Sequence, residues 1–262
     1  MNQENKGFRL HPIFKSLIVL FGIIAGAFII ITIIEQQPDE VGACGDWDKQ
    51  GIDVSHYQGN IDWEKVANET NIKFAYIKAT EGSSHKDSLY KHNTQQARRA
   101  GIAVGSYHYF HPNVPVATQY ANFMSSVDLT TQDLIPVIDI EEKGRKPSKQ
   151  ICDSLDKFSS MILEQWGTLP IIYTHQRFYN YLLQRSFDEH ILWIARYGAY
   201  KFKLTPSLED KRECSVWQYS NRGIVEGIEG YVDLNTLHGD TEITDIMLTR
   251  RFKREAMRVQ PQ

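Results

Sequence analysis

The sequence predicts an α/β fold, an incomplete β/α barrel of eight strands and about five helices, preceded by one transmembrane helix. Three observations support this prediction. Apolar, strand-like segments alternate with helix-like segments from residue 51 to residue 184. Three more strand-like segments then follow, joined by loops, and the pattern closes near residue 243. An uncharged run near the N-terminus precedes the whole pattern.

The uncharged run covers residues 16–34, and at about 1.5 Å per residue a helix of this length spans roughly a bilayer core. Basic residues precede the run, so residues 1–15 should stay in the cytoplasm while the rest of the chain is exported. A cleaved signal peptide is the alternative. Because the run exceeds the usual apolar part of a signal peptide and no A-x-A site closes it, we expect a signal anchor. The domain would then lie on the periplasmic or extracellular side of the membrane.

Composition and cysteine spacing argue against a nucleic-acid-binding protein and against a zinc site. The net charge is −3 and no broad basic stretch occurs before residue 250, which argues against nucleic acid as a partner. The three cysteines, Cys44, Cys152 and Cys214, form no C-x-x-C pair and have no zinc spacing. After export, a Cys152–Cys214 disulfide and buried free thiols both remain open. We expect a monomer without cofactor or metal.

The strands are predicted from short apolar runs. They are residues 51–54, 73–78, 102–109, 134–138, 169–174, 191–197, 214–220 and 230–234. The fourth run, LIPVI, is apolar throughout, which is typical of a parallel strand buried on both faces. A polar linker at 35–47 precedes the predicted domain at 48–243, and a basic tail at 244–262 follows it.

The helices are predicted from their end signals and apolar sides. They are residues 62–66, 89–100, 116–127, 148–166 and 178–184. Asp62 is a candidate N-cap, Pro115 introduces the third helix, and Ser148 can cap the long fourth one. Gly101 and Gly167 are candidate C-terminal caps. The long helix has one apolar side, formed by Ile151, Leu155, Phe158 and Ile162.

Four acids stand where strands should end: Asp53, Asp139, Glu141 and Asp233. In LIPVIDIEE, a spacing of two places Asp139 and Glu141 on the same face of the strand, while Glu142 points away. Each acid alone could be a cap or turn residue. Together at one rim of a barrel they would repel one another and raise at least one pKa, which provides a proton donor near neutral pH. Glycoside cleavage needs such a donor beside a second stabilising group.

Aromatic residues lie at the same predicted strand ends. They are Tyr76, Tyr107, Tyr109, Phe110, Tyr173, Trp193, Tyr197, Trp217 and Tyr219. Some must belong to the core, and the rest could form a sugar-binding groove. Motifs of nucleotide binding, of serine hydrolases and of zinc proteases are absent from the sequence. His108 and His111 are interpreted as packing or groove residues and not as metal ligands.

Several separated motifs resemble those of glycoside hydrolase family 25, the Chalaropsis-type lysozymes or N-acetylmuramidases. In chain order they are GIDVSHYQGNIDW, FAYIKATEG, GSYHYF, IPVIDIE, PIIYT, LWIARY, WQYS and GIEGYVDLN. The similarity covers about residues 48–240, and the order and spacing of the motifs make it specific. The barrel of that family, with eight strands and fewer helices than the full β/α form, agrees with the predicted fold.

The resemblance implies hydrolysis of the β-1,4 bond between N-acetylmuramic acid and N-acetylglucosamine in peptidoglycan. Glu141 matches the general acid of the family, and Asp139 matches the carboxylate that orients or stabilises the 2-acetamido group of the substrate. Asp53 and Asp233 match two further acids of the catalytic centre. The expected substrate-binding residues are Tyr76, Tyr107, Tyr109, Tyr173, Trp193 and Trp217. We favour retention of configuration with assistance from the substrate acetamido group.

The sequence leaves several alternatives for the function. A catalytically inactive peptidoglycan-binding module is one alternative, although all four acids are present. A glycosidase acting on chitin-like chains is another, because both substrates carry 2-acetamido sugars. The membrane segment favours remodelling or catabolism of the cell's own wall over attack on other cells. The sequence leaves the stereochemical outcome and the tolerance for modified or crosslinked peptidoglycan undecided.

Overall fold

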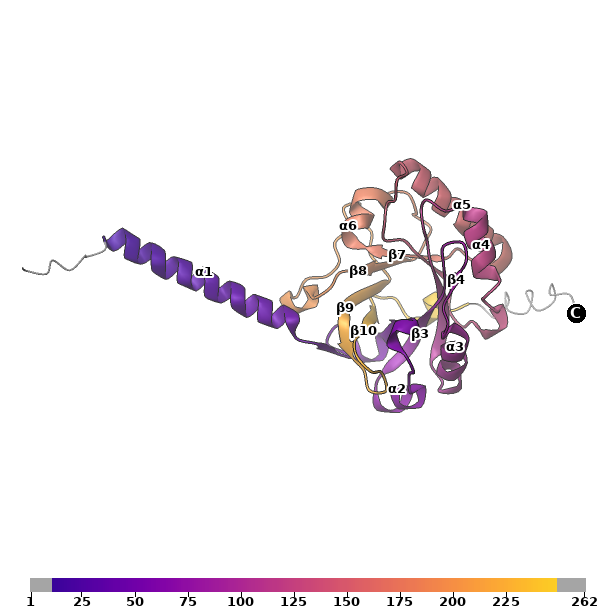
Figure 1. Ribbon diagram of the computed structural model, residues 1–262, viewed down its shortest axis with the longest axis horizontal. Helices are drawn as coiled ribbons and strands as arrows, with labels where there is room; N and C mark the ends of the chain where they lie inside the picture. Colours follow the sequence, from indigo (N-terminus) through magenta and orange to yellow (C-terminus); the bar gives the residue numbers. More distant parts are fainter. Residues whose placement is uncertain (1–10, 249–262) are drawn as a thin grey trace, which may run out of the picture. The chain divides into compact units, whose positions relative to one another are not determined.

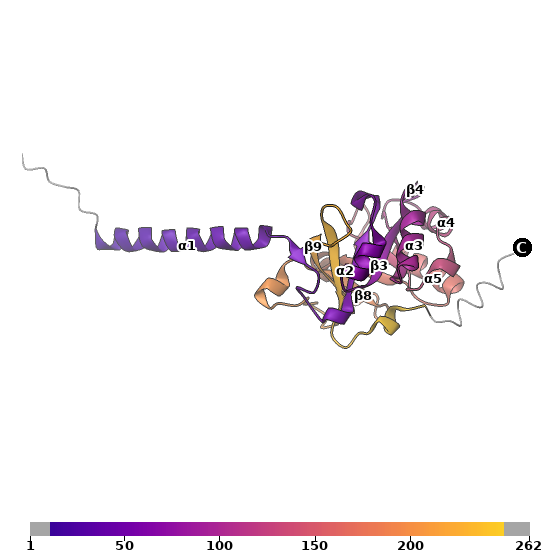
Figure 2. The same ribbon diagram turned by 90° about the horizontal axis from the view of Figure 1, so that it is seen from below.

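The computed structural model describes residues 11–248 (Figures 1 and 2). The chain divides into two compact units, Met1–Pro38 and Asp39–Gln262. The first contains helix α1 (Pro12–Gln36). Its segment Ser16–Ile34 has a mean hydropathy of 3.1, and 0% of it is buried against the rest of the protein. The helix is therefore long and apolar enough to cross a membrane.

The second unit is a closed barrel of eight strands, which confirms the predicted fold class. The strands are β2 (Gln50–Val54), β3 (Ile72–Glu81), β5 (Ala103–Tyr109), β6 (Val137–Asp139), β7 (Ile171–His175), β8 (Leu192–Ala195), β9 (Val216–Ile224) and β10 (Val232–Leu237). They pair in this order, and the β8–β9 and β10–β2 pairings close the sheet. Seven strands run parallel, and β10 is antiparallel to both of its neighbours.

The reversed direction of β10 decides where its first residues lie. Asp233 pairs in register with Asp53 of β2. Because β10 runs against the other strands, its beginning lies at the same rim as their C-terminal ends. The sequence placed Asp233 at the end of a strand, whereas the structure places it near the start of one. Both descriptions bring the residue to the same rim of the barrel.

The helices gather beside β3 to β7, and the side formed by β9 and β10 carries no long helix (Figures 1 and 2). They are α2 (Trp63–Glu69), α3 (Tyr90–Arg99), α4 (Val116–Met124), α5 (Ser148–Trp166) and α6 (Gln176–Phe178), which continues as a π-helix, η4 (Tyr179–Leu183). Short 3-10 turns are η1 (Trp47–Lys49), η2 (His56–Gln58), η3 (Leu129–Thr131), η5 (Ala199–Phe202) and η6 (Ile243–Ile246). With only η5 between β8 and β9, the β/α alternation is incomplete, as predicted.

The end signals of the helices agree with the structure in most places. The Asp62 carboxylate accepts a hydrogen bond from the Lys65 amide at 3.0 Å, which confirms Asp62 as the N-cap of α2. Gly167 ends α5 in the left-handed conformation, with φ of 65°. The predicted cap of α5 is wrong, because Ser148 is the first helical residue and Pro147 occupies the capping position.

The apolar side of α5 packs into the core as predicted. Ile151, Leu155, Phe158 and Ile162 are all fully or almost fully buried. The Phe158 ring stacks on the His108 imidazole at 5.2 Å between centroids, on the outer face of the sheet. The α5 helix therefore packs on the outer face of the parallel strands. It does not cover the rim formed by their C-terminal ends.

The structure differs from the prediction at both ends of the barrel. The predicted linker at 35–47 already joins the barrel at β1 (Asp39–Glu40), which pairs with the end of β9. Asp39 is buried, and the Lys201 ammonium lies 2.7 Å from its carboxylate. At the other end, the buried Ile246 accepts a hydrogen bond from the Ile135 amide at 2.8 Å, so the barrel extends past residue 243. Of the predicted basic tail, residues 249–262 lie outside the described range.

A short hairpin strand, β4 (His85–Lys86), pairs with the end of β3. Within residues 11–248 the three cysteines, Cys44, Cys152 and Cys214, are free thiols. Burial raises the pKa of Cys44 and of Cys214 to about 12, so both are neutral side chains of the core.

Candidate active site

A cavity of about 230 Å³ opens at the rim formed by the C-terminal ends of the parallel strands. The four predicted acids, Asp53, Asp139, Glu141 and Asp233, all lie in its wall. Asp53 and Asp139 come from the ends of β2 and β6, Glu141 follows β6, and Asp233 comes from the start of the antiparallel β10. Strands on opposite sides of the barrel thus direct two pairs of acids into one space.

The first pair, Asp53 and Asp233, is tied into the sheet. Asp53 Oδ2 accepts hydrogen bonds from Gln218 Nε2 at 2.8 Å and from Asn235 Nδ2 at 2.7 Å. Burial raises the pKa of Asp53 to about 6, although the two amides and Asp233 oppose the increase. Burial, together with the repulsion by Asp53 and a hydrogen bond to it, raises the pKa of Asp233 to about 9. At neutral pH, Asp53 is therefore mostly ionised and Asp233 carries a proton.

The two amides that hold Asp53 are themselves fixed by aromatic side chains. Gln218 Oε1 accepts hydrogen bonds from the hydroxyl groups of Tyr173 at 2.7 Å and Tyr197 at 2.9 Å. Asn235 Oδ1 accepts one from Trp193 Nε1 at 2.9 Å. An indole N–H can only donate, so Asn235 must present its nitrogen to Asp53. The two tyrosine hydroxyls occupy the oxygen of Gln218, which leaves the nitrogen of this amide for Asp53. The network therefore favours the ionised form of Asp53.

The second pair, Asp139 and Glu141, lies on the opposite wall and is held more loosely. Asp139 Oδ1 is buried and makes no hydrogen bond with any described residue. Burial and the charge of Glu141 raise the pKa of Asp139 well above its usual value. The Glu141 side chain is 30% exposed, and its Oε2 lies 2.9 Å from Nε2 of His175 at the end of β7. Both side chains line the cavity, and Glu141 is the partly exposed member of the pair.

Aromatic rings cover the remaining wall. Of the predicted substrate-binding residues, Tyr107, Tyr109, Tyr173 and Trp193 line the cavity, and so does Tyr197. The Tyr173 and Trp193 rings meet edge to face, with 5.0 Å between their centroids. Flat rings beside carboxylates suit a sugar, which has apolar ring faces and polar edges.

Tyr76 is a core residue, which corrects the prediction that it binds substrate. It is fully buried, does not line the cavity, and donates its hydroxyl hydrogen to the Ile135 carbonyl at 3.2 Å. Its ring lies 4.9 Å from the Trp193 ring. Tyr76 therefore acts one layer below the cavity, as packing beneath Trp193.

Trp217 also differs from the prediction. It lines a different cavity, together with Cys44 and His238, and its Nε1 donates to the Arg196 carbonyl at 3.0 Å. The reason is strand alternation, since its neighbour Gln218 points inward to Asp53 and Trp217 must point outward.

Several residues of the site were missed at the level of sequence. They are Ser55, Tyr57, Gln58 and Lys78 in the cavity wall, and His175, Gln218 and Asn235 as partners of the acids. The available signal was a polar residue within an apolar strand motif, as in FAYIKATEG, WQYS and GYVDLN. A buried polar side chain in a strand needs a partner, which the sequence alone does not identify.

The two histidines interpreted as packing or groove residues have separate surroundings. The buried His108 contacts the Thr80 hydroxyl at 2.7 Å and Gln119 Oε1 at 3.2 Å, and burial lowers its pKa to about 4. His111 lies between two carboxylates, those of Glu81 and Glu142. Across residues 11–248, no group of three or more His, Cys, Asp or Glu side chains is arranged to hold a metal ion.

Comparison with known proteins agrees with this geometry. Residues 52–228 match the model of glycosyl hydrolases family 25. The chain belongs to glycosyl hydrolase family 25. It is 37% identical to the Escherichia coli protein YegX over 73% of this chain and 70% of that protein. It is 33% identical to Lysozyme M1 of Streptomyces globisporus, over 77% of this chain and 72% of the relative.

A solved structure supports the same assignment. The family 25 glycosyl hydrolase from Bacillus anthracis superposes with a TM-score of 0.67 and 33% identity, over 74% of this chain and 90% of that one. The protein is therefore a glycoside hydrolase with a barrel fold, and the cavity with four acids is its candidate active site.

Proposed function

We propose that this glycoside hydrolase is a lysozyme that cuts the β-1,4 bond between N-acetylmuramic acid and N-acetylglucosamine in peptidoglycan. The observation that carries the proposal is the convergence of Asp53, Asp139, Glu141 and Asp233 on one cavity of a family 25 barrel. Membership of the family that includes lysozymes supplies the substrate class. The four acids supply both a proton donor and the negative charge that stabilises an oxocarbenium-like transition state.

In this proposal Glu141 is the general acid and base. Its side chain is 30% exposed, so a leaving oxygen and later a water molecule can reach its carboxyl group. Asp139 lies beside it in the cavity wall and has a raised pKa. In the complex its carboxyl group would accept the N–H of a 2-acetamido group, which would orient the acetamido oxygen toward the anomeric carbon.

The reaction would then proceed with retention of configuration. Glu141 donates its proton to the leaving oxygen while the acetamido oxygen attacks the anomeric carbon and forms an oxazolinium ion. Glu141 next removes a proton from a water molecule that opens this ion. Asp53, held ionised by Gln218 and Asn235, stabilises the positive charge across the cavity.

The protein is also proposed to be anchored in a membrane, with the barrel on the periplasmic or extracellular side. The length and hydropathy of Ser16–Ile34 support this, and so does the excess of basic residues before it. An anchored monomer fits remodelling or catabolism of the cell's own wall. Recovery of a mature soluble protein that begins after residue 35 would contradict this part of the proposal.

The deciding experiment is digestion of purified cell walls by the full-length protein in detergent, beside its Glu141→Gln form. Mass spectrometry of the soluble fragments should show reducing N-acetylmuramic acid ends for the natural protein and no fragments for the variant. Equal digestion by both would remove Glu141 from the catalytic role. Binding of walls without any cleavage would indicate an inactive binding module instead. The anomer formed first, followed by NMR, tests retention, since an initial α-anomer would exclude it.

A further inference from the structure

Lys78 is the one lysine, arginine or histidine among the residues that line the acid cavity. It lies within β3, and its side chain is 10% exposed. A lysine is almost never this deeply buried unless it is paired. Its position beside four acids therefore calls for a functional or structural reason.

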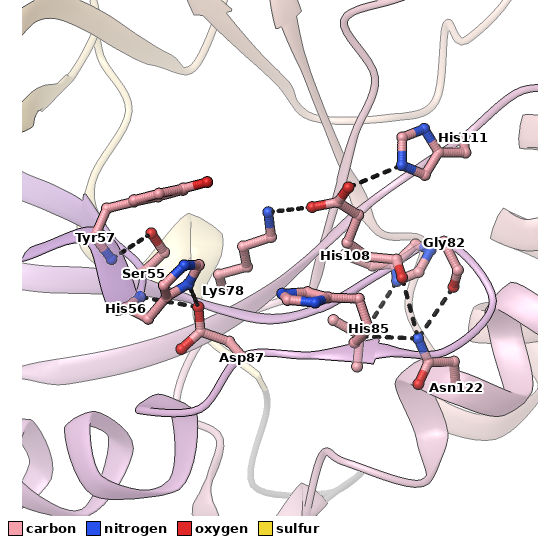
Figure 3. A network of polar contacts seen from close by, with 12 residues as sticks. Ser55, His56, Tyr57, Lys78, Gly82, His85, Asp87, His108, His111 and Asn122 are labelled. Atoms are coloured by element: carbon pink, nitrogen blue, oxygen red, sulfur yellow. Dashed lines mark hydrogen bonds and ion pairs between the residues drawn. The ribbon is translucent and has the colours of Figure 1, made fainter.

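A chain of ion pairs holds the Lys78 ammonium in place (Figure 3). Its Nζ lies 2.6 Å from Glu81 Oε2, and the other oxygen of Glu81 lies 2.9 Å from Nε2 of His111. Nδ1 of His111 lies 2.9 Å from Glu142 Oε1. The ammonium is also 5.1 Å from the centre of the Tyr109 ring, which lines the same cavity. Lys78 is thus fixed from the outer side of the rim.

The ammonium has unused hydrogen-bonding capacity toward the cavity. An ammonium group carries three N–H donors, and in the described part of the chain Glu81 is the side chain that accepts one of them. Because Lys78 lines the cavity, a ligand there can reach the remaining donors. A carboxylate is the ligand group that best satisfies a positively charged donor.

Charge explains why such a contact would matter for the substrate. The ionised acids of the cavity, Asp53 among them, repel an anionic chain, whereas a neutral sugar chain meets no such repulsion. A muramic acid residue carries a lactyl carboxylate when it is free of peptide, and a peptide stem carries carboxylates of its own. A cation on the cavity wall offsets the repulsion at one defined point.

We propose that Lys78 binds a carboxylate of the glycan substrate and makes the enzyme select acidic amino-sugar chains over neutral ones. The carboxylate comes from the lactyl group of muramic acid or from its peptide stem. This inference rests on the proposed lysozyme function. The competing role is purely internal, since the positive charge of Lys78 also acts on Asp139, whose pKa it lowers against the larger opposing effects.

The test removes the positive charge of Lys78 in the enzyme and the carboxylates of the substrate, separately and together. The full-length protein and Lys78→Met are assayed on three substrates by the new reducing ends they release. These are glycan strands stripped of peptide, the same strands with carboxylates converted to methylamides, and strands with intact stems. For the natural protein, conversion to methylamides should lower kcat/KM by about 10- to 100-fold. Lys78→Met should lose a similar factor on acidic strands and respond little to the conversion.

The three substrates also identify the source of the carboxylate. Dependence on Lys78 with stripped strands indicates the lactyl group, and dependence only with intact stems indicates the peptide. Lys78→Arg keeps the charge and should retain most of the preference. Lys143→Met removes a partly buried lysine whose Nζ lies 3.4 Å from the Tyr181 hydroxyl, outside the cavity, and should change nothing.

Two results would overturn the proposal. One is an equal loss by Lys78→Met on acidic and neutral strands, which would mean that Lys78 acts only through Asp139. The other is equal cleavage of acidic and neutral strands by the natural protein, a comparison that needs no variant to fold. Failure of the natural protein to release reducing ends from any strand would instead refute the lysozyme function itself.

Discussion

The two pairs of acids in the cavity differ in how the barrel holds them. Asp53 and Asp233 lie on neighbouring strands paired in register, and two buried amides bond to Asp53. Asp139 and Glu141 lie two residues apart on one strand end, where Asp139 keeps a free oxygen and Glu141 is partly exposed. The first pair has a fixed orientation within the sheet, whereas the second pair is open to the cavity through the partly exposed Glu141.

This difference indicates a division of labour within one site. A carboxylate held by two amides stabilises charge without moving, because its surroundings are already organised. A carboxyl group that transfers protons needs access to the reacting atoms and a pKa near the working pH. Each pair could be tested by disrupting the feature that distinguishes it from the other.

The largest effect is expected for Glu141→Gln, which removes the exposed acid of the second pair. Peptidoglycan hydrolysis should fall by about 10³- to 10⁴-fold, because an amide cannot donate the proton to the leaving oxygen. The measurement is the rate at which reducing ends are released. Glu164→Gln is the matched control, since this exposed residue of α5 lies outside the cavity wall, and its activity should stay within about threefold. A large loss in the control would indicate that the assay does not report on the cavity.

Asn235→Ala disrupts the first pair by removing one of the amides that bond to Asp53. The pKa of Asp53 should rise above about 6, because an opposing hydrogen bond is lost. The acidic limb of the pH–rate profile should move upward, and activity at pH 6 should fall by about tenfold. The variant also leaves Trp193 Nε1 without its acceptor, so its thermal unfolding must be recorded beside the profile. An unchanged acidic limb would mean that the charge of Asp53 does not limit the reaction.

Asp233→Asn tests the fixed proton of the first pair through stability. The pKa of Asp233 is about 9 in the folded protein, against an ordinary value of 3.8, so between these values the folded state holds a proton that the unfolded state lacks. Stability from this group is therefore present at low pH and is lost as pH rises through this window. The Tm of the natural protein should fall more between pH 5 and pH 8.5 than that of the variant, by on the order of 5 °C. Asp240→Asn, at an exposed site, should keep the natural pH dependence.

The smallest effects are expected for removal of a tyrosine hydroxyl, and they should differ between Tyr173 in the cavity and Tyr76 in the core. Tyr173→Phe removes a donor to Gln218 and should lower activity by about three- to tenfold, because the amide that holds Asp53 becomes less constrained. Tyr76→Phe removes only the bond to the Ile135 carbonyl, so activity should be unchanged and stability should fall by about 1 kcal/mol. Assays of both variants on the same substrate check this, and equal losses of activity would place Tyr76 back in the site.

Local structure and the chemistry of the key positions could be predicted from short-range patterns in the chain. Apolar runs predicted all eight strands, Asp62 and Gly167 marked helix ends, and the LIPVIDIEE pattern placed Asp139 and Glu141 on one face of a strand. These features depend on residues close together in the chain, since periodicity and capping act over a few residues. The motifs also indicated the family, which the comparisons confirm.

Which side chains meet depends on the closed barrel and could not be predicted from the chain. The reversal of β10 sets Asp233 opposite Asp53, and the inward direction of Gln218 turns Trp217 away from the cavity. The Tyr76 ring packs beneath Trp193 in the core. The ion pair with Glu81 holds Lys78 in the cavity wall. Pairings such as those of Asp53 with Gln218 and Asn235 join residues more than 160 positions apart. Closure of the barrel creates them, and local sequence patterns carry no information about such distant partners.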